Sequence, residues 1–182
     1  MTDTTRDGPP RAALIAAIVL AVGAAVGFLV FAAVTQHRQG PAPVALSTVP
    51  APRADGPECA TLVEKLPDQL GDYRRAPLVD PAPAGAVAWQ RDDGGEPLVL
   101  RCGVERPTDF VVGAPLTVVD AVSWFEVQDS ADTERATWFA VDRPVYVALT
   151  LPSGSGPDAI QTVSKTLADA LSARPVDPGP AR

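Results

Sequence analysis

An uninterrupted run of apolar residues lies near the start of the chain. Residues 12–34 hold 23 consecutive positions without a charge, and a helix of that length extends about 34 Å at about 1.5 Å per residue. The hydrocarbon core of a bilayer is thinner, at about 30 Å. Because a lone segment in lipid must satisfy its own backbone hydrogen bonds, only a helix suits it. The pattern therefore predicts a transmembrane helix over residues 12–34.

A cleaved signal peptide is the alternative interpretation, because Arg6 and Arg11 form a positive N-terminal region. The apolar part of a signal peptide runs for only about 7–15 residues and ends at a small-x-small cleavage site. Here the run is longer and is followed by residues 35–38, Thr-Gln-His-Arg. The pattern favours an uncleaved signal anchor. The arginines before it indicate that residues 1–11 form a cytoplasmic tail and that the rest is extracytoplasmic.

Two further segments are rich in proline. Residues 35–56 contain four prolines without a helical or strand period, which predicts an extended spacer that reaches up to about 60 Å. Residues 174–182 contain three prolines, which predicts a disordered tail. The foldable domain is therefore expected over residues 57–173.

Hydrophobic spacing in this domain predicts a helix at each end with strands between them. Cys59, Leu62, Val63 and Leu66 follow a helical period, and so do the apolar positions of residues 160–171. Alternating segments predict strands over residues 86–91, 97–104, 122–128, 135–141 and 145–151. Because neither helix can bury its apolar stripe alone, we expect an α+β fold: an antiparallel sheet of four to six strands with both helices packed on one face.

The only two cysteines, Cys59 and Cys102, both follow the predicted anchor. Cysteines on the oxidising side of a membrane usually pair, so the sequence predicts a disulfide between them. Its role would be to stabilise the domain. The alternative is redox activity of Cys59, since a thiolate near a helix N-terminus is stabilised. Without a C-x-x-C motif, that alternative has little support.

The sequence offers few groups for catalysis. His37 is the only histidine, and it lies at the membrane edge, so histidine-based hydrolysis and a zinc site of the usual kind are both unexpected. No metal or other cofactor is predicted. The net charge of −7 argues against nucleic acid as a partner, because such binding requires dense positive charge.

Three pairs of residues have both a functional and a structural interpretation. Arg74 and Arg75 could clamp an anion or contact a partner, or they could be exposed charges. Gly23 and Gly27 form a G-x-x-x-G spacing that could dimerise the membrane helix. The acidic pair within residues 92–95 is typical of a solvated turn rather than of a glycosidase site.

Several blocks of the domain resemble a known family. These are Cys59 leading a short helix, Ala-Trp at residues 88–89, Leu-Arg-Cys-Gly-Val at residues 100–104 and Val-Asp-Ala-Val-Ser-Trp at residues 119–124. They are similar to the actinobacterial membrane-anchored proteins grouped as domain of unknown function 3515. The resemblance implies a cell-envelope location and paired cysteines, and it implies no activity.

The sequence thus favours a non-enzymatic domain, displayed outside the cytoplasmic membrane, that binds an envelope protein or a cell-wall component. One alternative is an envelope enzyme that uses carboxylates or Arg74 and Arg75. The other is a thiol-disulfide component built on Cys59 and Cys102. Contact with the membrane would be made through residues 12–34.

Overall fold

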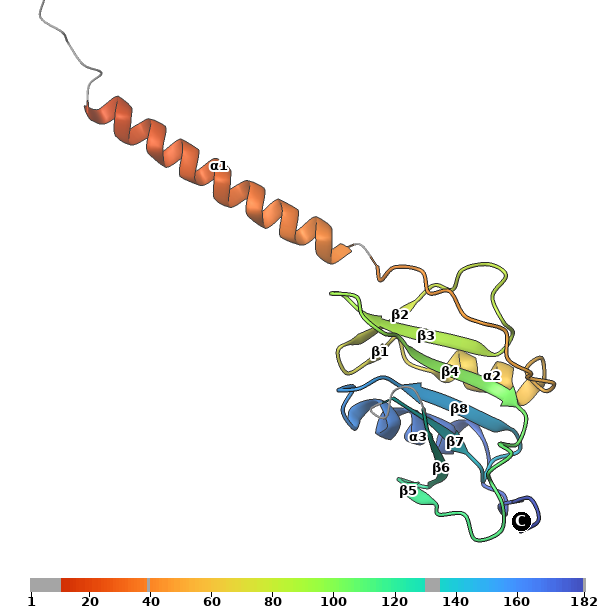
Figure 1. The fold of residues 1–182 in the computed structure, drawn as a ribbon. Coiled ribbons are helices and arrows are strands. Elements are labelled where there is room, and N and C mark those ends of the chain that lie inside the picture. The colour runs from red at the N-terminus through yellow and green to blue at the C-terminus, as the bar shows by residue number, and fades with distance from the viewer. Residues whose placement is uncertain (1–10, 39, 130–134, 182) are drawn as a thin grey trace, which may run out of the picture. The chain divides into compact units, whose positions relative to one another are not determined.

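The computed structural model describes residues 11–38, 40–129 and 135–181, and it divides into a unit before residue 41 and a unit from Pro41 onward. The elements of the described residues, labelled in Figure 1, are α1 (Arg11–Arg38), α2 (Pro57–Lys65), β1 (Gln69–Leu70), β2 (Tyr73–Ala76), β3 (Ala86–Arg91), β4 (Leu98–Val104), β5 (Thr117–Val119), β6 (Val122–Gln128), β7 (Ala136–Ala140), β8 (Tyr146–Leu151) and α3 (Asp158–Ala170).

Helix α1 forms the first unit. Its segment Ala12–Ala32 is apolar and long enough to cross a membrane, and no part of that segment is buried. An anchor and a signal sequence both fit this finding, because both are apolar helices near an N-terminus. Of the expected cytoplasmic tail, residues 1–10 lie outside the described part of the chain.

The second unit is built on one antiparallel sheet with the strand order β1-β2-β3-β4-β8-β7-β6-β5. The hairpin expected around residues 92–95 is confirmed, since β3 pairs with β4 and places Trp89 opposite Leu98. The three later strands also form close to their expected bounds, as β6, β7 and β8. Strand β4 pairs with β8 at the centre of the sheet, so residues distant in sequence become neighbours there.

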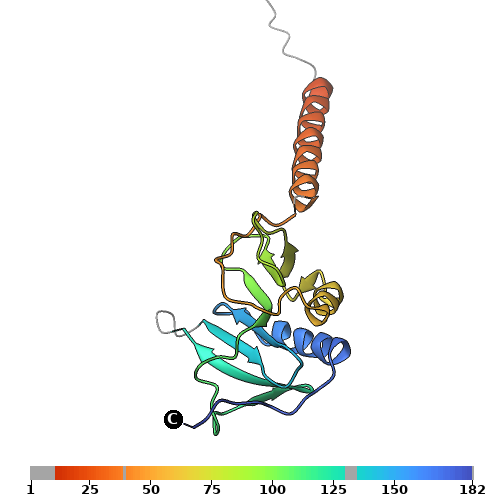
Figure 2. The same cartoon turned by 90° about the vertical axis from the view of Figure 1, so that its right-hand side faces the viewer.

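The sheet is larger than the four to six strands expected, because β1, β2 and β5 add three short strands at its edges. The expected packing of two helices on one face is not matched either. Helix α3 contacts β1 near one edge and β5 and β6 at the other, while α2 packs chiefly on α3. A twist of about 20–25° per strand turns eight strands through about 150°, so the sheet curves around α3 instead of offering a flat layer (Figure 2).

The main core fills the concave side of the sheet. Trp89 and Trp124 have no exposed surface and pack there with apolar side chains of α3, and α2, which packs chiefly on α3, extends apolar side chains into the same cluster. The indole nitrogen of Trp124 donates a 2.9 Å hydrogen bond to the hydroxyl oxygen of Ser164 on α3. This bond satisfies two buried polar groups that would otherwise cost stability. Tryptophan therefore serves the packing of the domain at these two positions.

Residues 41–56, which we call the strap, pack against the convex side of the sheet. Val44 is buried against Ala76, Ala88 and Val99. Its amide donates to the carbonyl of Pro77 at 2.8 Å, and its own carbonyl accepts from the amide of Val79 at 3.0 Å. This differs from the expected spacer. Proline prevents a helix, but it does not prevent an extended segment from pairing with a neighbouring one.

The C-terminal segment also packs, in contrast to the expected disorder of residues 174–182. The amide of Arg174 donates to the carbonyl of Asp142 at 2.8 Å, and Gly179 exchanges backbone hydrogen bonds with Phe110 and Val112 at 2.8 and 2.9 Å. These contacts lie beside a second convex-side cluster around Phe110 and Phe125. Partners far away in sequence therefore order a segment that has no period of its own.

A hydrogen bond from Tyr146 joins this segment to β8, and its contribution to stability should decrease at alkaline pH. Its hydroxyl donates to the carbonyl of Asp177 at 3.1 Å, and burial, together with the negative charge of Asp177, raises the pKa of Tyr146. A raised pKa in the folded state stabilises the fold below the unfolded-state pKa of about 10, and this contribution is lost as the pH rises further.

We therefore expect Tyr146→Phe to be less stable than the natural chain at about pH 8 by about 1 kcal/mol, the usual net value of one hydrogen bond. The difference should shrink above about pH 10. Denaturant unfolding across this pH range measures it, and a constant difference would contradict the assignment.

Candidate functional site

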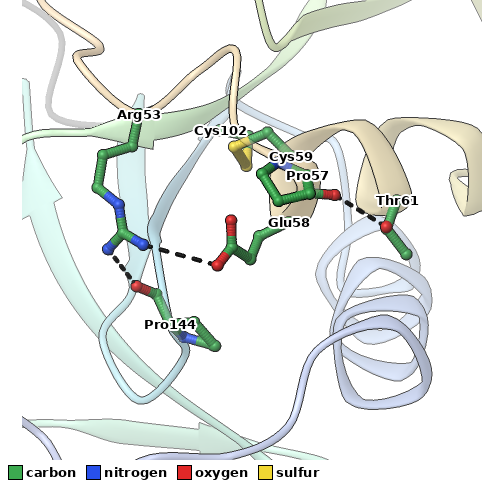
Figure 3. The surroundings of a disulfide bond; sticks show 7 residues. All are labelled: Arg53, Pro57, Glu58, Cys59, Thr61, Cys102 and Pro144. Atoms are coloured by element: carbon green, nitrogen blue, oxygen red, sulfur yellow. Dashed lines mark hydrogen bonds and ion pairs between the residues drawn. A yellow bond between two sulfur atoms is a disulfide. The ribbon is translucent and has the colours of Figure 1, made fainter.

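The two cysteines lie together between α2 and β4. The sulfur atoms of Cys59 and Cys102 are 1.99 Å apart, their Cα atoms are 5.5 Å apart, and both residues are fully buried. Cys59 lies in the first turn of α2 and Cys102 on the concave face of β4, so the pair joins helix to sheet (Figure 3). A thiol-exchange partner cannot reach sulfur atoms buried in this way.

The strap passes directly beside this pair. The Arg53 guanidinium donates to the carbonyl of Pro144, and it lies 3.8 Å from the carboxylate of Glu58 on α2 (Figure 3). The amide of Arg53 donates to the carbonyl of Gly103 at 3.2 Å. The strap is therefore fastened to the segment that precedes β8, to α2 and to β4 at one place.

Gly103 makes this close crossing possible. Its φ of +79° lies in the left-handed region, which glycine adopts without strain. A Cβ atom at this position would lie within 3.0 Å of backbone atoms of Arg53 and Ala54. The pairing of β4 with β8 also shifts register between Cys102 and Val104, as in a β-bulge. Glycine is thus needed both for the bulge and for the passage of the strap.

The structure does not bring Arg74 and Arg75 together as an anion clamp. Adjacent residues of a strand point to opposite faces. Arg74 donates to the Asp92 carboxylate at 2.7 Å, whereas Arg75 donates to the carbonyls of Val63 and Leu66 at 3.2 Å, at the C-terminal end of α2. A cation is favourable at a helix C-terminus, so Arg75 has a structural role.

The remaining sequence candidates are separate from one another. Gly23 and Gly27 lie within α1, where an added Cβ would meet nothing within 4 Å, so helix dimerisation through them stays a prediction. The side chain of His37 lies outside the described residues. Asp93 is bonded to Arg91 at 3.1 and 3.2 Å in the exposed turn. Within the described part of the chain, no group of three or more potential metal ligands occurs.

A buried ion pair that the sequence did not reveal joins two turns. The side chain of Arg143 is only 1% exposed, and its Nη1 lies 2.9 Å from Oδ1 of Asp142. Arg143 also donates to the carbonyl of Ala121 at 2.6 Å, and the other Asp142 oxygen accepts from the amide of Ser123 at 2.8 Å. The pair fixes the β5–β6 turn against the segment before β8, where a dissolved ligand has no access.

A groove on the convex side of the sheet is accessible, and we call it the outer-face groove. It has a volume of about 360 Å³ and is lined by Ala45, Leu46, Ser47, Val49, Glu96, Pro97, Val99, Arg101, Arg135 and Thr150. The strap forms one wall, and β4 and β8 form the floor. The strap cluster around Val44 and the cluster around Phe110 cover other parts of this face, so the groove marks a part between them that is left open.

Arg101 is the charged group on the floor of this groove. It is half-buried, and burial lowers the pKa of Arg101, although arginine stays protonated in proteins. Its Nη2 donates to the carbonyl of Ser47 in the strap at 2.8 Å. No carboxylate of the described residues lies within ion-pair distance of it. By contrast, Arg106, in a hollow of about 330 Å³ beside the C-terminal segment, lies 3.7 Å from the carboxylate of Asp177.

Comparison with known families identifies the chain at this point. The model of a family described as "Protein of unknown function (DUF3515)" matches residues 18–176. The chain belongs to this family. No curated protein and no solved structure matches it. The match begins within α1 and continues through the strap and α3, so part of the apolar helix and the strap belong to the DUF3515 pattern. The family resemblance of the domain, with its block at residues 100–104, is thereby confirmed.

Residues 100–104 of this DUF3515 chain, Leu-Arg-Cys-Gly-Val, have a structural task at every position. Leu100 and Cys102 face the core, and Val104 is buried at the end of β4. Arg101 binds the strap and lines the groove, and Gly103 allows the strap to cross. One pentapeptide thus carries the disulfide partner, the strap contacts and the cation of the groove. Strand alternation predicted β4, but nothing local revealed that the strap crosses it at Gly103.

Proposed function

We propose that the chain is an anchored protein of the cell envelope whose domain binds a partner outside the cytoplasmic membrane without catalysing a reaction. Its N-terminus is cytoplasmic, and α1 remains uncleaved as the anchor. The observation that carries the proposal is the outer-face groove, an accessible site with a wall made by the strap and with Arg101, which has no carboxylate partner among the described residues. A paired cysteine framework is what an oxidising compartment permits, which supports the location.

The two alternatives have less support. A thiol-disulfide component needs an accessible sulfur atom, and both Cys59 and Cys102 are fully buried. An arginine-dependent enzyme built on Arg74 and Arg75 needs both groups at one reacting centre, whereas each is engaged elsewhere, on Asp92 and on α2. A binding function requires neither condition.

The packed strap also changes the expected reach of the domain. From the end of α1 at Arg38 to the first strap contact at Val44 there are six Cα–Cα steps, which span about 20 Å when fully extended. The unstructured spacer expected from the sequence would have allowed about 60 Å. The strap residues therefore do not serve as a free spacer.

Topology and binding are tested in cells by two measurements. A phosphatase that is active only outside the cytoplasm, fused to the C-terminus, should be active, and a fusion to the N-terminus should be inactive. A photo-crosslinking amino acid at Val49, on the groove wall, should capture a partner that the same group at Val176 does not. Both valines are 41% exposed, so Val176 is a matched control for Val49. Inactive C-terminal fusions, or equal capture at both positions, would contradict the proposal.

A further inference from the structure

We propose that the outer-face groove binds a phosphate or carboxylate group of its partner through the guanidinium of Arg101. This inference rests on the proposed binding function and names the chemistry that the site recognises. An arginine can hold either oxyanion with two parallel N–H···O bonds, which a lysine cannot do.

The first support is the hydrogen-bonding capacity that Arg101 retains. A guanidinium has five N–H donors, and Nη2 of Arg101 donates to the carbonyl of Ser47. Arg74, Arg91 and Arg143 each have a carboxylate partner at 3.1 Å or less, and Arg75 donates to two carbonyls at the end of α2. A half-buried cation whose neighbour is a neutral carbonyl is best satisfied by an anion from solution.

The second support is the position of the guanidinium. Arg101 lies opposite Ala148 in the β4–β8 pairing, and Val99 lies opposite Thr150 in the same register. Thr150 adds a hydroxyl that shares a 3.0 Å hydrogen bond with the hydroxyl of Thr137 on the next strand. The floor therefore offers the charge of Arg101 and the hydroxyl group of Thr150, which is able to hydrogen-bond to an oxyanion.

The third support is that the strap holds the arginine in place. The Ser47 carbonyl fixes one end of the guanidinium, and Val44 and Leu46 of the strap pack on the sheet beside it. A side chain held before binding loses less conformational freedom when the ligand arrives. The wall and the charged group are thus positioned by the same segment.

Arg135 provides a second cation further along the groove. Its Nη1 lies 3.4 Å from the Glu96 carboxylate, and both side chains are more than 40% exposed. Exposed pairs of this kind contribute little to stability, so the arginine can exchange its partner for a ligand at small cost. The chain as a whole carries −7, so the site suits a single oxyanion group rather than a densely charged polymer.

Calorimetric titration of the full-length chain in neutral detergent tests the inference. Inorganic phosphate and acetate are titrated separately at constant ionic strength set with chloride, which distinguishes the two oxyanion chemistries. We expect saturable binding of at least one of them. Arg101→Gln should weaken that binding by about tenfold or more, the range expected for a lost charge-assisted pair. Arg101→Lys should weaken it less, because the charge remains without the bidentate geometry.

Arg91→Gln is the matched control, since it removes the same charge from an exposed arginine outside the groove, and it should leave binding unchanged. Two results would overturn the inference. The natural chain would show no saturable binding, or Arg101→Gln and Arg101→Lys would both bind as tightly as the natural chain. Unfolding curves show whether each variant is folded. If Arg101→Gln does not fold, the comparison of Arg101→Lys with the natural chain provides the test. If Arg101 does not bind an oxyanion, the fusion and Val49 crosslinking results are unaffected. The oxyanion site and the proposed binding function are therefore tested separately.

Discussion

Replacement of both Cys59 and Cys102 by alanine is expected to lower the free energy of unfolding by about 4 kcal/mol. The two residues are 43 positions apart, and a cross-link that closes a loop of this length removes much of the conformational entropy of the unfolded chain. The link also joins α2 to the central strand β4, while the remaining contact of α2 is chiefly with α3. Its loss should therefore loosen α2 first.

Denaturant unfolding of the full-length chain in neutral detergent measures this effect. The control is the reducing agent itself, which should destabilise the natural chain and leave the Cys59→Ala, Cys102→Ala double variant unchanged. Maleimide should label neither cysteine of the unreduced chain after unfolding, and both after reduction. Labelling of both without reduction would show that the bond is absent.

Gly103→Ala is expected to cost about 3 kcal/mol, from two sources. A left-handed backbone is about 1–2 kcal/mol less favourable for alanine, and the Cβ atom would collide with the strap backbone at Arg53 and Ala54, with an overpacking cost of about 1–3 kcal/mol. Because the strap is held by fewer contacts than the core, it should detach while the sheet remains folded. Detachment would expose the peptide bond after Arg53 to trypsin.

Gly94→Ala separates the two sources. Gly94 has a similar φ, +84°, but a Cβ atom there meets nothing within 4 Å. The Gly94→Ala substitution should therefore lower the free energy of unfolding by only about 1 kcal/mol and leave the bond after Arg53 protected from trypsin. Equal losses of stability in the two variants would show that the strap does not press on Gly103. Rapid cleavage after Arg53 in the natural chain would contradict strap packing altogether.

The sequence predicted those elements whose own pattern is long and regular. Strand β4 was expected because Leu98, Leu100, Cys102 and Val104 alternate. Strands β1, β2 and β5 were missed because they have two to four residues each. β2 reads Tyr-Arg-Arg-Ala and has no alternating apolar face, since partners across the sheet decide its conformation.

The groove could not be predicted for a related reason. Ser47, Arg101 and Thr150 are brought together by the strap and by the β4–β8 pairing, and no local pattern encodes either. The strap itself was misjudged because its prolines suggested an independent spacer. Two apolar residues, Val44 and Leu46, were the available signal, but two alternating positions are too few to predict a docked segment.

The order of the fastenings along the chain determines how the domain responds to mechanical tension. A pull on Pro41 acts first on the strap, whose hydrogen bonds at Val44 can be released one after another. Peeling stops at Cys59, because the disulfide transfers the load directly to β4. The chain between residues 44 and 59 has a contour length of about 50 Å, which is the upper limit of the slack released. A pull along the anchor would therefore lengthen the tether and uncover the groove wall while the sheet stays folded.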